Sequence, residues 1–453
     1  MIEFRPIPYV DPFSWFSCFE EKPGTLFLDN ASTSLGIGQY SYLLWNPFLE
    51  FTAQQNRCFW NTSPLEVKGN PLEIFFQKMK EFSSEKDPTI PPFQGGAVGF
   101  FAYDLAWSLE RLPDLKPREH SFPDMQFYFY DHGLSFDTLH QKAWIFRQSF
   151  CSDSCDELMQ QVPSPHKTRR TIQEPKKITI QSNFTQAEYL KVLEKTKSHL
   201  HAGDIFQANI SQRFRGSLPL APRDLYARLR AISPAPYAAY LDFGSRKILS
   251  SSPESFLLRQ GEWIHTHPIK GTRKRGKTPE EDEFLKKQLL GSEKDRAELT
   301  MIIDLSRNDL GRVCQYGSVR VHHLSQGGIV LETHPTVYHL VSHIEGKLWP
   351  ISSHLDVLKA CFPGGSITGA PKIRAMEIIE DLEPTKRGVY TGTYGWIGFD
   401  QDLQLAMGIR LLQIEDDQFS FQVGGGIVID SDPEEEYQET LIKARGILKA
   451  LQG

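Results

Sequence analysis

The sequence has few of the features that mark secreted, membrane-bound or nucleic-acid-binding proteins. Its six cysteines are scattered, and only Cys151 and Cys155 lie close together, without the second pair or nearby histidine that would complete a zinc site. No run of about 18 apolar residues occurs, and the N-terminus lacks a signal-peptide pattern. A formal net charge of −6 gives no electrostatic basis for binding nucleic acid or an anionic membrane. These absences predict a reduced, cytoplasmic protein that neither spans a membrane nor binds nucleic acid.

Several common nucleotide-binding and hydrolase motifs are also missing. No Gly-x-Gly-x-x-Gly fingerprint follows an expected strand, and no Gly-x-Ser-x-Gly elbow occurs. The glycine-rich stretch 361–372 ends in Ala370-Pro371-Lys372 instead of the Gly-Lys-Ser/Thr order of a Walker A loop. This stretch precedes an expected helix, whereas Gly424–Gly426 follows an expected strand over 419–423. Each is therefore either an anion site built from backbone amides or a tight turn.

The expected elements divide the chain into two regions. Residues 1–165 contain strand-like runs such as 125–130, which we expect to end in a turn over 131–133. Residues 163–170 are rich in proline and basic side chains and form the expected linker. Residues 185–453 begin with a helix capped by Thr185 and continue with strands over 204–214, 237–243 and 247–250.

A single lysine stands in the turn-like segment Pro268–Thr272, between a strand-like run and a basic stretch. Proline fixes φ on entry and glycine permits a turn without a Cβ clash, so Lys270 is well placed to point into a cleft. Only the neutral amine is a nucleophile. Lys270 is thus either a candidate nucleophile or a solvated loop lysine.

Two expected helices each carry a pair of carboxylates. Asp295 and Glu298 share one face of a helix that begins near 292, because they stand three residues apart. Glu436 and Glu439 do the same on a helix that begins near 433, whose buried stripe we expect to be Tyr437, Leu441, Ala444, Leu448 and Leu451. The pairs either meet around a hard cation such as Mg²⁺ or form two solvated faces.

These segments together resemble the chorismate-utilising enzymes. The resemblance covers 185–450 densely and the segments 93–101 and 122–125 more loosely. Within this family the chain is most similar to the aminodeoxychorismate synthases. The motifs that carry the resemblance are Pro268–Thr272, Asp304–Arg312, His339–Ser342, Pro363–Lys372, Gly424–Val428 and Tyr437–Thr440.

The resemblance implies an α+β fold of the anthranilate synthase component I type. In that fold two antiparallel β-sheets pack as a sandwich, with helices outside and an active-site cleft between the halves. The regions 1–165 and 185–453 are then an N-terminal region and a chorismate-binding catalytic domain, intertwined in one globule.

The resemblance also implies ligands for the candidate residues. Mg²⁺ would be held mainly by Glu298 and Glu439, with Asp295 and Glu436 nearby or acting through water. Cationic and backbone donors suit a dicarboxylate such as chorismate. The residues implied in binding it are Ser366, Thr368, Tyr390, Arg410, Gly424, Gly425, Gly426 and Lys443.

Three residues match the catalytic positions of the family. Glu254 matches the general acid, and His339 matches an active-site histidine that either takes part in catalysis or orients its neighbours. The position of Lys270 is usually lysine in aminodeoxychorismate synthases and alanine in anthranilate synthases. Isochorismate and salicylate synthases have a water-activating lysine where this chain has Gln207, and an amide cannot act as that base.

The resemblance therefore implies that Lys270 attacks C2 of chorismate while Glu254 protonates the hydroxyl leaving from C4. Ammonia then adds at C4 and yields 4-amino-4-deoxychorismate, on the route to 4-aminobenzoate and folate. Two rival functions are anthranilate synthase component I and a non-catalytic chorismate-binding subunit. An intact set of Lys270, Glu254, Glu298 and Glu439 argues against the second.

The sequence shows no Gly-x-Cys-x-Gly glutaminase pattern. We therefore expect ammonia to come from solution or from a separate glutamine amidotransferase subunit, component II. Some relatives also hold tryptophan, in a pocket whose counterparts here are Asn30, Tyr40, Ser41, Pro236 and Tyr237. The segment Asp29-Asn30 differs from the Leu-Glu-Ser pattern of feedback-regulated members, so binding of an amino acid stays open.

Overall fold

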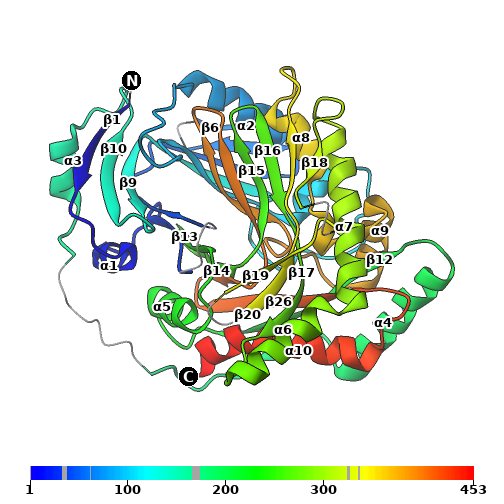
Figure 1. The fold of residues 1–453 in the computed structure, drawn as a ribbon. Helices are drawn as coiled ribbons and strands as arrows, with labels where there is room; N and C mark the ends of the chain where they lie inside the picture. The colour runs from blue at the N-terminus through cyan, green and yellow to red at the C-terminus, as the bar shows by residue number, and fades with distance from the viewer. Residues whose placement is uncertain (1, 33–37, 62, 166–173, 324–326, 335–336) are drawn as a thin grey trace.

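A computed structural model describes residues 2–32, 38–61, 63–165, 174–323, 327–334 and 337–453. Most of the expected linker, 166–170, lies outside these residues. The described chain forms two large antiparallel sheets and a small third one, with helices on the outer faces (Figure 1). The α+β sandwich expected from the sequence is confirmed.

The first sheet contains strands from both ends of the chain. Its order is β1 (Glu3–Ile7), β10 (Lys142–Arg147), β9 (His132–Asp137), β3 (Tyr40–Leu44), β2 (Leu26–Asp29), β13 (Tyr237–Phe243), β14 (Arg246–Ser252), β25 (Leu411–Glu415), β26 (Gln418–Ile427), β12 (Gln207–Ser217) and β11 (Gln181–Ser182), with β22 (Gly369–Ala370) beside β12.

The second large sheet also contains strands from the N-terminal and C-terminal regions of the chain. Its order is β18 (Arg320–Val321), β21 (Ile344–Lys347), β16 (Trp263–His267), β15 (Ser255–Gln260), β24 (Leu403–Met407), β23 (Thr393–Gly398), β7 (Gly96–Phe101), β8 (Met125–Tyr130), β4 (Leu49–Gln54), β5 (Arg57–Trp60) and β6 (Ser63–Lys68). The third sheet consists of β17 (Ile269–Lys274), β20 (Val337–Val341) and β19 (Val330–Thr333).

The helices cover the outer faces of the sandwich (Figure 1). They are α1 (Pro12–Cys18), α2 (Pro71–Met79), α3 (Cys155–Gln161), α4 (Gln186–His201), α5 (Pro222–Ile232), α6 (Pro279–Leu290), α7 (Glu293–Gly311), α8 (His354–Cys361), α9 (Lys372–Leu382) and α10 (Pro433–Gln452), with 3-10 turns at Lys80–Phe82, Tyr103–Ser108 and Gly365–Ile367. None of the described helices is long and apolar enough to cross a membrane.

Local signals position several of these helices where the sequence predicts them. Thr185 and Glu188 form a reciprocal capping box that starts α4. The side chain of Asp432 caps α10, with proline at the first helical position, and Ser292 caps α7. These helix starts depend on short-range hydrogen bonds, which is why they can be predicted without the tertiary structure.

The hydrophobic core of the described residues comprises four clusters, of which the smallest lies between β12, β26 and the helices α4 and α9. Apolar side chains from both large sheets, such as Leu44, Tyr130 and Trp396, fill the space between them. A second cluster lies between the first sheet and the helices α1, α3, α5 and α10. A third lies between the second sheet and α2, α7 and α8. Burial on both faces explains why strands such as β8 are apolar or aromatic at nearly every position, with Gln126 as the exception in β8.

Two local predictions are wrong. The segment 131–133 is not a turn, because β9 starts at His132 and belongs to the other large sheet from β8. The chain passes between the sheets at Asp131. The glycines 424–426 do not follow a strand but lie inside β26, paired with β12 from Ser211↔Gly424 to Asn209↔Gly426. Glycine in mid-strand leaves room for another group to approach closely.

A buried ion pair fixes the inner end of β12. Arg387 is 2% exposed and donates to both carboxylate oxygens of Glu383, at 2.9 and 2.7 Å. Its other N–H groups donate to the carbonyl of Asn209 on β12 and to that of Ile367. The Glu383 carboxylate also accepts from Ser211 on β12. A buried charge pair is tolerated when its hydrogen bonds are satisfied in this way.

We expect Arg387→Met to lower the free energy of unfolding by about 3–5 kcal/mol, because it leaves the buried Glu383 carboxylate without its counter-ion. Urea unfolding monitored by circular dichroism measures this, with the exposed Arg374→Met on α9 as the matched control. Adding Glu383→Gln to Arg387→Met should restore part of the loss. Equal stability of the Arg387→Met and Arg374→Met variants would contradict the assigned role.

Candidate active site

Glu254 and Arg410 stand at two neighbouring points where the chain crosses between the large sheets. Glu254 connects β14 to β15, and Arg410 connects β24 to β25. The crossings are joined by hydrogen bonds from Ser251 N to Arg410 O and from Met407 N to Glu254 O, at 3.1 and 2.9 Å. Arg410 has a φ of 50°, a strained value for a residue other than glycine. The fold thus brings together a carboxyl and a guanidinium that are far apart in sequence.

The environment of Glu254 favours a protonated carboxyl near neutral pH. The residue is 5% exposed, and burial raises its pKa from the ordinary value to about 7. The Ser366 hydroxyl donates to Oε1 at 2.8 Å and opposes that rise, as do the charges of Lys270 and Arg410. A carboxyl that exchanges its proton near pH 7 is suited to general acid catalysis.

Lys270 lies on β17 beside a bulge in its pairing with β20. The bulge contains Gly271, which has a φ of 75°, and a Cβ there would lie 2.9 Å from Asp295 on α7. Only glycine permits this close approach of strand and helix. The Lys270 amine, 13% exposed in its side chain, lies 3.7 Å from a carboxylate oxygen of Glu298. The predicted nucleophile and the first predicted metal ligand are therefore neighbours.

His339 lies on β20 directly opposite Thr272. Its Nδ1 is 2.8 Å from the Thr272 hydroxyl, and its ring packs at 5.1 Å from that of His334. Burial lowers the pKa of His339 to about 3, with further lowering by the Arg410 charge. The imidazole is therefore neutral at pH 7, which suits orientation of its neighbours better than proton donation.

Three of the four predicted metal ligands converge. Glu298 on α7 interacts electrostatically with Glu436 and Glu439 on α10, and burial raises its pKa. Lys294 bridges the helices, with its amine 2.9 Å from Glu436 Oε1. Glu439 pairs with Lys443 at 2.7 Å, and this cation lowers its pKa. The structure therefore brings Glu298, Glu436 and Glu439 of the two helices together.

The fourth carboxylate points elsewhere, and the buried face of α10 differs from the predicted stripe. Asp295 pairs with Arg273 at 3.2 Å. Ala444 and Leu451 are buried as predicted, but the other buried positions of α10 are Glu436, Thr440, Ile447 and Ala450, so the buried face is rotated by about one residue from the predicted one. The buried face of α10 is rotated because two polar side chains on it are buried with hydrogen-bond partners. Glu436 accepts from Ser431, and Thr440 accepts from Gln212.

The glycine strand carries the second half of the site. A Cβ at Gly425 would lie 2.9 Å from Glu436 Oε2, and one at Gly426 would lie 2.9 Å from Gln207 Nε2. Lys443 donates to the Gly424 carbonyl at 2.9 Å. Gln207 is fully buried, and neither of its amide atoms has a hydrogen-bond partner among the described residues. A buried amide of this kind is available to hydrogen-bond a bound substrate.

Tyr390 and Thr368 contact Asn209 on β12, the residue paired with Gly426. Tyr390 interacts with the Asn209 side chain, and burial raises the pKa of its phenol to about 12, so it remains a neutral donor. Thr368 is fully buried and donates to the Gly364 carbonyl at 2.8 Å. The Thr368 hydroxyl therefore braces the glycine-rich loop, whereas the neighbouring Ser366 hydroxyl contacts Glu254.

Two pockets have predicted site residues in their linings. The first is lined by Glu254, Ser366, Gly365 and the α7 residues Ile302 and Ser306, but not by Lys270 or Arg410. It therefore reaches one side of the general-acid candidate only.

The second pocket lies at the predicted tryptophan site. Tyr40, Pro236 and Tyr237 line it, whereas Asn30 and Ser41 do not. Asn30 instead donates its backbone N–H to the Ser41 hydroxyl. Asp29 lines the pocket, although its carboxylate is bound by Tyr226 and Arg230. A polar group of an amino acid would have to compete with those two bonds.

The sequence prediction missed three contributors. Lys294 stands four residues before Glu298 and so faces the same cluster, a spacing that could have revealed it. Asn209 and Arg387 were missed because their roles depend on contacts between segments distant in sequence.

The carboxylate cluster fits a hard divalent cation. Glu298, Glu436 and Glu439 supply oxygen donors only, and Gly425 leaves space beside Glu436. In this structure the three carboxylates pair with lysine ammonium groups. A bound divalent cation carries the same sign of charge and can take the place of these ammonium groups.

A buried acid at a crossing between two packed sheets, a nearby amine and a carboxylate cluster on two helices define an enzyme site for a small anionic substrate. The family model described as chorismate binding enzyme matches residues 26–449. The chain therefore belongs to the family of chorismate-binding enzymes.

Relatives in this family carry more than one activity. The chain is 40% identical to aminodeoxychorismate synthase component 1 of Bacillus subtilis (strain 168), over 85% of this chain and 83% of the relative. It is 36% identical to anthranilate synthase component 1 of Acetivibrio thermocellus, over 97% and 92%. The crystal structure of anthranilate synthase component I from Streptococcus pneumoniae TIGR4 superposes with a TM-score of 0.78 at 30% identity, covering 95% of this chain and 93% of that one.

We expect the Glu254 carboxyl to titrate near pH 7 in the folded protein, because burial disfavours its charged form. Carbon-13 NMR of glutamate-labelled protein should show one carboxyl signal with that midpoint, absent in Glu254→Gln. Ser366→Ala should move the midpoint to higher pH, because the lost hydrogen bond stabilises the carboxylate. A Glu254 signal that titrates near pH 4.5, the ordinary value, would refute the assignment.

Proposed function

We propose that this protein converts chorismate and ammonia into 4-amino-4-deoxychorismate. Lys270 is the observation that carries this proposal. It stands within electrostatic reach of the buried acid Glu254, while Gln207 occupies the place of the water-activating lysine of isochorismate synthases. The rival activity, anthranilate synthesis, is favoured only by the names of several relatives.

The reaction proceeds in two displacements. The Lys270 ammonium, which pairs with Glu298, first gives up a proton to solvent. The resulting amine bonds to C2 of chorismate, the ring double bonds shift, and the C4–oxygen bond breaks. Glu254 gives its proton to the departing hydroxyl, which leaves as water. Ammonia then bonds to C4, the double bonds shift back, and the lysine amine is released from C2. Dividing one displacement into two lowers the barrier of each.

The remaining residues bind and orient the substrate. The carboxylates of chorismate meet Arg410, the Tyr390 hydroxyl and the backbone of Gly424–Gly426, near Lys443. Gln207 hydrogen-bonds the substrate through its unpartnered amide. Neutral His339 holds Thr272 and hence the β17 bulge next to Lys270.

Mg²⁺ is the proposed cofactor, held by Glu298 and Glu439 with Glu436 beside them. When bound, it neutralises a substrate carboxylate and fixes its position. Ammonia is supplied by solution or by a separate glutamine amidotransferase subunit, in keeping with the component 1 names of the relatives.

Product analysis tests this function. The purified chain with chorismate, ammonium salt and Mg²⁺ should form a product that keeps the enolpyruvyl group and gains a 4-amino group, detected by mass spectrometry. The chain alone should not use glutamine, and a chelator should stop the reaction. Formation of anthranilate with release of pyruvate would establish the rival activity instead.

The covalent role of Lys270 predicts a mass increase on the peptide that carries it when chorismate and Mg²⁺ are supplied without ammonia. Lys270→Ala should lower kcat/KM by about two orders of magnitude, since ammonia can still attack directly. Lys274→Ala on the same strand, whose side chain is 71% exposed, is the matched control and should keep full activity. Full activity of Lys270→Ala with no adduct in the unmodified chain would exclude the covalent path.

A further inference from the structure

Histidine side chains gather around one carboxylate at the outer edge of the second sheet, away from the carboxylate cluster. Glu345 lies on β21, and His265 stands directly opposite it on β16. His343 precedes β21, and His322 follows β18. The rings of His322 and His343 stack at 4.2 Å, and that of His267 packs 4.3 Å from His343. The proposed reaction uses none of these side chains.

The donor atoms of this cluster have the spacing of a tetrahedral metal site. His265 Nδ1 lies 3.3 Å from His343 Nε2 and 3.6 Å from Glu345 Oε2. His322 Nε2 lies 3.0 Å from the same oxygen. Zn²⁺ binds imidazole nitrogen at about 2.0–2.1 Å in tetrahedral geometry, which separates neighbouring donors by about 3.3–3.4 Å. His265, His343 and Glu345 therefore need only small shifts to share one ion. The His322 ring, which stacks on His343, has to rotate to join them.

The protonation state of the histidines agrees with that geometry. Burial and the neighbouring imidazoles lower the pKa of His343 to about 4, and burial lowers that of His265. Neutral imidazole is the form that binds a metal. The His265 and Glu345 side chains are only partly buried, at 15% and 17% exposed, so an ion can reach them.

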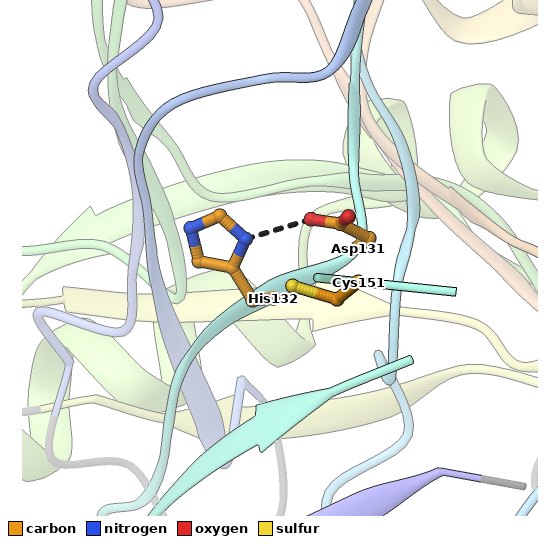
Figure 2. A group of neighbouring side chains, drawn as sticks. All are labelled: Asp131, His132 and Cys151. Atoms are coloured by element: carbon orange, nitrogen blue, oxygen red, sulfur yellow. Dashed lines mark hydrogen bonds and ion pairs between the residues drawn. The ribbon is translucent and has the colours of Figure 1, made fainter. Parts of the chain in front are cut away.

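A second group of metal-type side chains offers less. Asp131, His132 and Cys151 are all buried, and His132 Nδ1 lies 2.7 Å from Asp131 Oδ1. Figure 2 shows that the other imidazole nitrogen points away from both partners. The nitrogen that faces the group is already in a hydrogen bond, so these residues are better explained as a buried hydrogen bond at the sheet crossing.

We propose that His265, His322, His343 and Glu345 form a binding site for one Zn²⁺-class ion. Three nitrogens and one oxygen favour a borderline transition metal over Mg²⁺. The site would join the start of β17 to the end of β20, because Pro268 leads from β16 to Lys270 and His343 follows the strand of His339. A hydrogen bond from Ser342 N to Pro268 O already connects these segments at 3.1 Å.

Zinc binding by the full, tag-free chain tests this proposal. After chelator treatment, and with Mg²⁺ in excess to occupy the carboxylate cluster, calorimetric titration should show one Zn²⁺ per chain. The double variant His265→Gln/His343→Gln should bind at least about 100-fold more weakly, because loss of a supporting residue alone commonly costs 10–100-fold. The exposed pair His140→Gln/His201→Gln and the variant Cys151→Ser are the matched controls and should bind as the unmodified chain does.

The coordination of Co²⁺ gives an independent readout on the unmodified chain, which holds even if the double variant fails to fold. We expect the intense visible absorption of tetrahedral Co²⁺ without a thiolate charge-transfer band. An octahedral spectrum, a thiolate band, no binding, or unchanged affinity in the folded double variant would each overturn the proposal. The test does not depend on the reaction proposed above.

Discussion

The geometry of the site depends on the buried ion pair between Arg387 and Glu383. Its guanidinium binds the carbonyls of Asn209 and Ile367, and the carboxylate binds Ser211. Each of these partners belongs to a segment that carries a site residue. Because an unpaired charge in this place would cost several kcal/mol, β12 and the glycine-rich loop are held in one relative position.

The active site lies where the chain leaves one sheet for another. Glu254, Arg410 and Lys270 all stand at or next to such crossings. A residue at a crossing is buried by both sheets but is not committed to the pleat of either, so its side chain can face the cleft. The same burial that closes the core raises the pKa of Glu254 to about 7 and keeps Tyr390 and His339 neutral. Packing and proton chemistry thus have one physical cause.

Membership of the family does not by itself decide the product. Relatives of similar identity are named for aminodeoxychorismate synthesis and for anthranilate synthesis, and the fold is common to both. The distinction that we propose rests on single side chains, chiefly an amine at 270 and an amide at 207. Both lie in backbone segments that the fold holds in place, so a change of side chain can change the reaction without changing the architecture.

The sequence by itself determined the helix starts at Thr185, Ser292 and Asp432, the paired strands β13 and β14, and most of the candidate site residues. Caps and periodicity act within a few residues, and motifs can be compared residue by residue. Only the tertiary structure decided that β8 and β9 belong to different sheets, that Asp295 turns to Arg273, and that Gly424–Gly426 lie inside a strand. It also decided the histidine cluster around Glu345. These outcomes depend on contacts between residues tens to hundreds of positions apart, and such contacts cannot be predicted from a local sequence pattern.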